Sequence, residues 1–217
     1  MRDTDKINKI SLESFIETIK FYDYDKLPGR EAHLRVMPIF DNFPYRSMKP
    51  RADSMQSAVM LLFVPDEDND ISIILTIRSE TIASHKGQIS FPGGKIEDGE
   101  TPLEAAFREV EEEIGVPSNS ISVLAQISDF YVMPSNSVVK PFIGIIDKMP
   151  DFIINEDEVQ ELILVKLNYL MNPDNLIMED WEFESFHATV PHWKVHHSKN
   201  LWGATAMMLS EVLQMLS

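Results

Sequence analysis

Hydrophobic and polar residues divide this chain into segments of strand length and segments of helix length. Short apolar-rich runs predict strands at residues 56–64, 70–79, 89–91, 121–131, 138–147 and 161–167. The polar stretch between the first two runs indicates a hairpin. Longer segments with apolar side chains at helical spacing predict helices at residues 11–22, 101–114 and 201–216.

The predicted strands and helices interleave without a regular βαβ repeat. Their order predicts an α/β fold with a mixed β-sheet flanked by helices. The chain has 217 residues, which suits one domain with a sizeable core. We expect a single domain over residues 1–217, with an N-terminal helix and extension at 1–55 and a core at 56–217. Residues 27–51 contain prolines and arginines, and we expect them to be irregular.

Composition excludes several classes of protein. Because there is no cysteine, a disulfide framework, a thiolate metal site and a cysteine nucleophile are all excluded. No run has the length of a signal peptide or a membrane span, so we expect a cytoplasmic protein with no membrane partner. The net charge of −16 should repel nucleic acid as well. A phosphate-rich small molecule would need a bound metal or a local cluster of Lys and Arg, although the acidity alone is equally explained by solubility.

The central helix has clear signals at both ends. Thr101 can cap its N-terminus, with Pro102 at the first helical position and Glu104 completing a capping box. Gly115 is placed to end the helix, and Pro117 prevents its continuation. The boundaries predicted for this helix therefore rest on local chemistry as well as on hydrophobic spacing.

A helical wheel separates the side chains of this segment into faces. The apolar stripe that should face the core consists of Leu103, Ala106, Phe107, Val110 and Ile114. Beside it lie Glu109, Glu112 and Glu113, at spacings that make them neighbours. Like charges at this spacing, near a helix C-terminus, are destabilising unless a cation binds. Oxygen ligands favour Mg²⁺ or Mn²⁺, whereas a solvated acidic face is the alternative.

The residues around these acids identify a family. Residues 94–116 fit the pattern G-x5-E-x7-R-E-U-x-E-E-x-G-U, in which U is aliphatic, at every position. A chance match has odds of about one in 10⁸ at any start position. The segment resembles the Nudix box, the signature of a family of metal-dependent pyrophosphohydrolases. The resemblance implies an α/β/α sandwich and Mg²⁺- or Mn²⁺-dependent hydrolysis of a nucleoside diphosphate derivative.

The resemblance also implies a role for individual residues. The metal ligands would be Glu109, Glu112 and Glu113, with the backbone of Gly94 close to the metal. Glu112 or Glu113 would also orient or deprotonate the attacking water, while Arg108 would pair with Glu100 and brace the loop. Nudix enzymes often supply a further acid from a late loop, and Glu158 is the candidate for it.

The segment that precedes the box narrows the substrate. Residues 74–94 resemble the additional motif of the coenzyme A pyrophosphatase branch, LLTxRSx3Rx3Gx3FPGG. Weaker similarity to this branch extends to residues 27–32 and 201–206. The second arginine of the motif aligns with Ala83, which cannot contact a phosphate as arginine does. The candidate substrate-binding residues are Arg78, Ser79, Lys86, Arg30 and Arg51.

Three functions remain open from the sequence. The first is hydrolysis of coenzyme A or a derivative to 3′,5′-ADP and 4′-phosphopantetheine. The second is hydrolysis of ADP-ribose, a nucleotide sugar or a nucleoside triphosphate by a Nudix hydrolase, which Ala83 leaves possible because it replaces an arginine of the coenzyme A motif. The third is a non-catalytic nucleotide sensor, against which the complete set of box acids argues. The surplus of apolar residues on the helix at 201–216 leaves a homodimer open.

Overall fold

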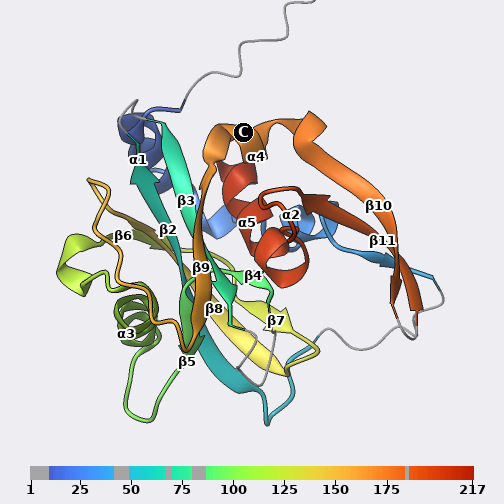
Figure 1. Ribbon diagram of the computed structural model, residues 1–217, viewed down its shortest axis with the longest axis horizontal. Helices are drawn as coiled ribbons and strands as arrows, with labels where there is room; N and C mark the ends of the chain where they lie inside the picture. The colour runs from blue at the N-terminus through green and yellow to red at the C-terminus, as the bar shows by residue number, and fades with distance from the viewer. Residues whose placement is uncertain (1–9, 42–48, 67–69, 80–86, 184–185) are drawn as a thin grey trace, which may run out of the picture.

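The computed structural model describes residues 10–41, 49–66, 70–79, 87–183 and 186–217, and its largest element is a mixed sheet (Figure 1). Eight strands of the described residues form this sheet, in the order β4-β3-β2-β8-β6, with β5 paired to β2, β7 to β8 and β9 to β3. Their bounds are β2 Met55–Pro65, β3 Ile71–Arg78, β4 Ile89–Ser90, β5 Gly93–Lys95, β6 Ser122–Gln126, β7 Phe130–Val132, β8 Ser137–Ile145 and β9 Val159–Lys166. Strands β2 and β8 run parallel, and the other pairs run antiparallel.

Helices cover both faces of this sheet, as Figure 1 shows. Helix α3 (Pro102–Ile114) packs on one face, where its apolar stripe meets Met60 and Leu62 of β2. Helices α1 (Leu12–Lys20) and α5 (Gly203–Met215) cover the other face, where Leu61 and Phe63 point. Alternate residues of β2 are thus buried on opposite sides, which explains its continuous apolar run. The expected α/β/α architecture is confirmed.

The N-terminal extension is more ordered than its sequence indicates. The sequence predicts an irregular stretch at residues 27–51, yet these residues contain helix α2 (Gly29–Arg35) and strand β1 (Ile39–Phe40). Helix α2 is only two turns long and follows Pro28, so it carries little helical periodicity. Tertiary packing stabilises it instead, because Ala32 is fully buried and its carbonyl accepts a hydrogen bond from Ser210 Oγ of α5 at 2.8 Å.

A second sheet is also absent from the sequence-based prediction. Strands β10 (Leu176–Phe183) and β11 (Phe186–Trp193) form an antiparallel hairpin, to which β1 adds a third strand. Acidic residues at 179, 180 and 182 interrupt the apolar pattern of β10, which is partly exposed. Short helix α4 (Leu167–Met171) and 3₁₀ turns at Tyr24–Lys26, Ser118–Ser120 and Pro173–Asn175 complete the described elements. None of the described helices has the length and hydropathy needed to cross a membrane.

Candidate active site

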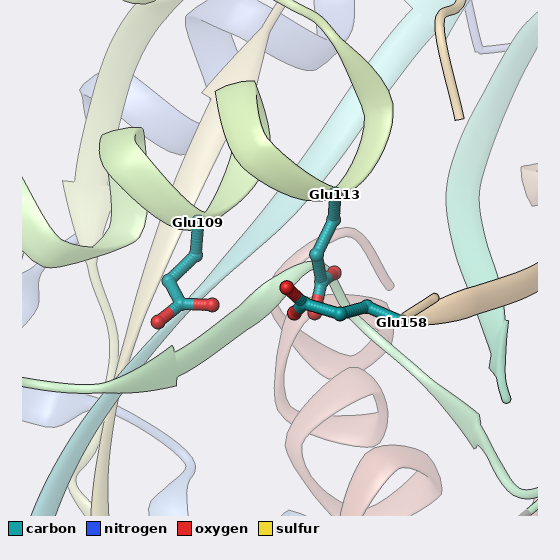
Figure 2. A group of neighbouring side chains, drawn as sticks. All are labelled: Glu109, Glu113 and Glu158. Atoms are coloured by element: carbon teal, nitrogen blue, oxygen red, sulfur yellow. The ribbon is translucent and has the colours of Figure 1, made fainter. Parts of the chain in front are cut away.

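The two ends of α3 fix the direction in which its acids point. Thr101 Oγ1 accepts a hydrogen bond from Glu104 N at 3.3 Å, and Glu104 Oε2 accepts one from Thr101 N at 2.8 Å. Gly115 ends the helix in the left-handed conformation, with φ 72°. Both ends follow the prediction. With both ends fixed, Glu109 and Glu113 from the last two turns of α3 come together with Glu158, which directly precedes β9 (Figure 2).

Three carboxylates converge beside this helix, as Figure 2 shows. Glu109, Glu113 and Glu158 each offer an oxygen, and these oxygens lie within 4.8 Å of one another. We call these three residues the acid group. Glu158 precedes β9 and joins the group from outside the Nudix box. Glu112 is not part of this group. Its side chain is 50% exposed, and its Oε2 accepts a hydrogen bond from Arg108.

Strand β5 approaches its neighbours closely at two glycines, Gly93 and Gly94. An added Cβ on Gly94 would overlap the carboxylate of Glu109, since it would lie against both of its oxygens. An added Cβ on Gly93, whose φ is 152°, would overlap the carbonyl oxygen of Ala58 and the backbone of Val59. The structure therefore brings the backbone of Gly94 directly against one member of the acid group.

Arg108 braces the loop that precedes α3. Its Nε donates to Glu100 Oε1 at 2.9 Å, and its Nη2 donates to Glu100 Oε2 at 3.2 Å and to the carbonyl of Lys95 at 3.0 Å. Its Nη1 donates to Glu109 Oε1 at 2.9 Å and to Glu112 Oε2 at 2.8 Å. The hydrogen bonds from Arg108 lower the pKa of Glu100. The Arg108–Glu100 pairing implied by the family resemblance is thus present.

The electrostatics of the acid group favour a bound cation. Glu113 is only 1% exposed, and this burial raises the pKa of its carboxyl to about 8 despite the opposing charge of Arg78. Burial also raises the pKa of Glu109. Glu113 Oε2 is buried and has no hydrogen-bond partner among the described residues. Three oxygen donors with an unfilled position suit a divalent cation such as Mg²⁺ or Mn²⁺.

Arg78 and Asn155 complete the surroundings of the acid group. Arg78 Nη1 lies 3.6 Å from Glu113 Oε1. Asn155 Nδ2 donates to Glu158 Oε1 at 3.2 Å, and Asn155 N donates to the carbonyl of Glu113 at 3.0 Å. Asn155 therefore fastens the loop of Glu158 to the end of α3. The sequence does not predict this role. It shows only that Asn155 stands three residues before Glu158 in a polar segment, which does not indicate a contact with α3.

The remaining predicted substrate-binding residues are scattered along the chain. Ser79 is buried, and its N donates to the carbonyl of Glu158 at 2.8 Å. Arg51 is exposed and pairs with Asp53, whereas Arg30 lines a pocket of about 300 Å³ between α2 and β7. The described parts of the chain contain no hydrogen bond or ion pair from either arginine to the acid group. Lys86, like Ala83, lies outside the described residues.

Comparison with known proteins places the chain in a family. Residues 54–193 match the NUDIX domain. Nudix hydrolase 3 of Caenorhabditis elegans is 28% identical over 209 residues, which cover 87% of this chain and 86% of that protein. The uncharacterized Nudix hydrolase NudL of Yersinia enterocolitica is 29% identical over 168 residues, or 76% of this chain and 84% of the relative. The solved Nudix hydrolase RenU from M. smegmatis aligns with a TM-score of 0.46 and 20% identity, over 62% of this chain and 80% of that one. Since the family match covers more than half of the chain, this protein belongs to the NUDIX domain family and is a Nudix hydrolase.

Proposed function

We propose that this protein hydrolyses the pyrophosphate bond of coenzyme A or its derivatives, giving 3′,5′-ADP and a 4′-phosphopantetheine compound. Hydrolysis of a nucleotide-like pyrophosphate follows from family membership. The observation that carries the reaction is the acid group, since Glu109, Glu113 and Glu158 converge within 4.8 Å. An anionic pyrophosphate cannot approach three carboxylates without positive charge between them.

We infer that the acid group holds Mg²⁺ or Mn²⁺. Glu109, Glu113 and Glu158 would supply the ligands, with the backbone of Gly94 alongside Glu109. Glu112 would join them only if its side chain moved, since it lies outside the acid group. A divalent cation supplies charge neutralisation to the pyrophosphate and acts as a Lewis acid toward its oxygens.

The residues of the chain would then share the remaining tasks. A carboxylate of Glu112, Glu113 or Glu158 orients the attacking water and takes its proton as the new P–O bond forms and the bridging P–O bond breaks. Arg78 lies next to the acid group and binds a phosphate oxygen of the substrate. Ser79, Lys86, Arg30 and Arg51 are further candidates for substrate contacts.

The preference for coenzyme A rests on the segment that precedes the box. Residues 74–94 resemble the coenzyme A pyrophosphatase motif, and its first arginine, Arg78, lies at the acid group. Ala83 supports a second candidate function, because it replaces the other arginine of that motif. That candidate is hydrolysis of ADP-ribose, a nucleotide sugar or a nucleoside triphosphate.

A substrate panel tests these proposals. The protein is incubated with Mg²⁺ or Mn²⁺ and coenzyme A, acetyl-coenzyme A, ADP-ribose, a nucleotide sugar or a nucleoside triphosphate, and products are identified by chromatography. We expect 3′,5′-ADP from coenzyme A, and no product in EDTA. Turnover of ADP-ribose with coenzyme A untouched would favour the second candidate. Absence of turnover with every substrate and both metals would overturn the hydrolytic assignment.

A further inference from the structure

Arg78 and Glu113 form an ion pair in which, as far as the structure describes the chain, each side chain keeps one buried polar atom without a hydrogen bond. Their 3.6 Å separation is too long for a hydrogen bond, although the charges attract. Arg78 Nε and Glu113 Oε2 are both buried without a hydrogen-bond partner among the described residues. Buried polar atoms of this kind cost free energy until another group completes them. Within the described parts of the chain, each member of the pair therefore has one buried polar atom that can accept a new partner.

The main chain of Arg78 is fixed by its pairing with neighbouring strands. The register between β3 and β9 shifts between Ile77 and Arg78, so that Arg78 pairs with Val159, directly after Glu158. Such a bulge redirects the side chain that it carries. Arg78 N also donates to the carbonyl of Gln88 at 3.0 Å. With the backbone fixed, a change of partner by Arg78 needs only a rotation of its side chain.

The charges at the acid group determine what can replace this pairing. Arg78 supplies one positive charge to Glu113, and a divalent cation supplies two. Because like charges repel, a cation bound at Glu113 would drive the guanidinium away. The oxygens of a phosphate accept the two parallel hydrogen bonds that a guanidinium can donate. A pyrophosphate that approaches the bound cation therefore presents a suitable new partner for Arg78.

We propose that Arg78 is the exchangeable counter-cation of Glu113. It pairs with this carboxylate while no divalent cation is bound, and it turns to a phosphate oxygen of the substrate when the cation takes the carboxylate. This inference rests on the proposed hydrolysis of a pyrophosphate. It adds that the cation and the pyrophosphate strengthen each other's binding through Arg78, which is reciprocal by thermodynamic linkage.

Binding of inorganic pyrophosphate to the metal-free protein tests the exchange. Calorimetry in EDTA at about pH 9, above the pKa of about 8 to which burial raises the Glu113 carboxyl, compares the wild type with Glu113→Gln, Glu109→Gln and the double variant Glu113→Gln/Arg78→Ala. Glu113→Gln should bind pyrophosphate about tenfold more tightly than the wild type, because Arg78 is released. Glu109→Gln removes the same charge from the same group, but the hydrogen bond to its carboxylate comes from Arg108. The affinity of Glu109→Gln for pyrophosphate should therefore rise less than about threefold. The double variant should not show the increase in affinity expected of Glu113→Gln.

Two results would refute the proposed exchange of partners by Arg78. One is an equal increase in pyrophosphate affinity in Glu109→Gln and Glu113→Gln, and the other is an increase that persists in the double variant without Arg78. Circular dichroism and Tm check that each variant is folded. If the double variant does not fold, the Nε–H resonance of Arg78 in wild-type protein decides, and it should shift on addition of Mg²⁺ without substrate. An unchanged resonance at saturating Mg²⁺ overturns the exchange. The substrate panel is independent, since an active enzyme without these effects refutes only the role of Arg78.

Discussion

Arg108 and Arg78 both contact carboxylates of helix α3, but among the residues that the structure describes Arg108 is saturated with hydrogen bonds and Arg78 is not. Arg108 donates to Glu100, Glu109, Glu112 and a backbone carbonyl, all between 2.8 and 3.2 Å. Arg78 approaches only Glu113 at 3.6 Å and leaves its Nε without a partner among the described residues. Residue type and partner type are the same, so the difference lies in geometry.

The difference shows how one acidic helix can contain a rigid part and an exchangeable part. The partners of Arg108 lie on its own helix, on the loop that leads into it or at the end of β5 just before that loop, so local chain geometry fixes them. Arg78 reaches Glu113 from β3, a distant part of the sequence. A saturated arginine stabilises the loop, whereas an unsaturated one can transfer to a ligand. Substitutions of Arg108 should therefore lower stability, whereas substitutions of Arg78 should affect substrate binding.

The largest expected effect is on kcat, and it should be much greater for Glu113 than for the adjacent Glu112. We expect Glu113→Gln to lower kcat about 10³-fold, because it removes the buried member of the acid group. Glu112→Gln should lower kcat only about tenfold, since Glu112 is half-exposed and bonded to Arg108. Steady-state kinetics with Mg²⁺ and the best substrate of the panel measure both. Equal losses would mean that Glu112 leaves Arg108 to join the metal site.

The next effect should come from the close approach at β5. Gly94→Ala would place a methyl group against the carboxylate of Glu109, and displacement by about 1 Å should lower kcat about 10²-fold. Gly99→Ala is the control, because no atom lies within 4 Å of its added Cβ, although its φ of 86° makes the change a strained one. Gly99→Ala should lower Tm and leave kcat unchanged. A normal kcat in Gly94→Ala would show that Glu109 can move without loss.

Helix α3 can be predicted from the sequence because its own residues determine where it begins and ends. Features that depend on contacts between distant segments of the chain cannot be predicted in this way. Capping residues and hydrophobic spacing are enough to predict the helix and its bounds, and the Arg108–Glu100 pair is implied by the family resemblance. The helical wheel cannot show that Glu112 faces solvent and Arg108, since burial depends on the neighbouring loops. Asn155 and the bulge at Arg78 depend on contacts between segments far apart in the sequence. The β10–β11 hairpin is missed because its acidic residues obscure the alternation.

A conservative change should distinguish the two arginines by their effect on stability. Arg108→Lys keeps the charge but loses the forked hydrogen bonds to Glu100, so we expect the free energy of unfolding to fall by about 1–3 kcal/mol. Arg78→Lys should leave the free energy of unfolding nearly unchanged and instead raise KM. Urea denaturation and steady-state kinetics provide the two measurements. Similar stability losses in both variants would contradict the division between a brace and an exchangeable residue.

A smaller effect should appear in the pH dependence of stability at α5. Glu211 is buried, and burial alone would raise the pKa of its carboxyl. Hydrogen bonds from Ser128 and the His33 ring outweigh this and hold that pKa below its ordinary value. A lowered pKa in the folded state adds stability that is present at neutral pH and is lost as the pH falls below about 4.5. The Tm difference between wild type and Glu211→Gln should therefore shrink from pH 7 to pH 3. A difference that grows toward low pH would contradict this assignment.

The smallest effect tests whether a short distance alone makes an arginine pair important. Arg51 Nε lies 3.1 Å from Asp53 Oδ1, as close as many contacts of Arg108, but its side chain is 64% exposed. Water and salt screen an exposed pair, and ordering two long side chains offsets what attraction remains. Arg51→Ala should therefore leave Tm within about 1 °C of the wild type. A scan at low and high salt checks this. A fall as large as that of Arg108→Lys would mean that distance, and not burial and saturation, distinguishes the arginines of this protein. An unchanged Tm together with a raised KM would instead keep Arg51 as a substrate contact and leave the structural comparison intact.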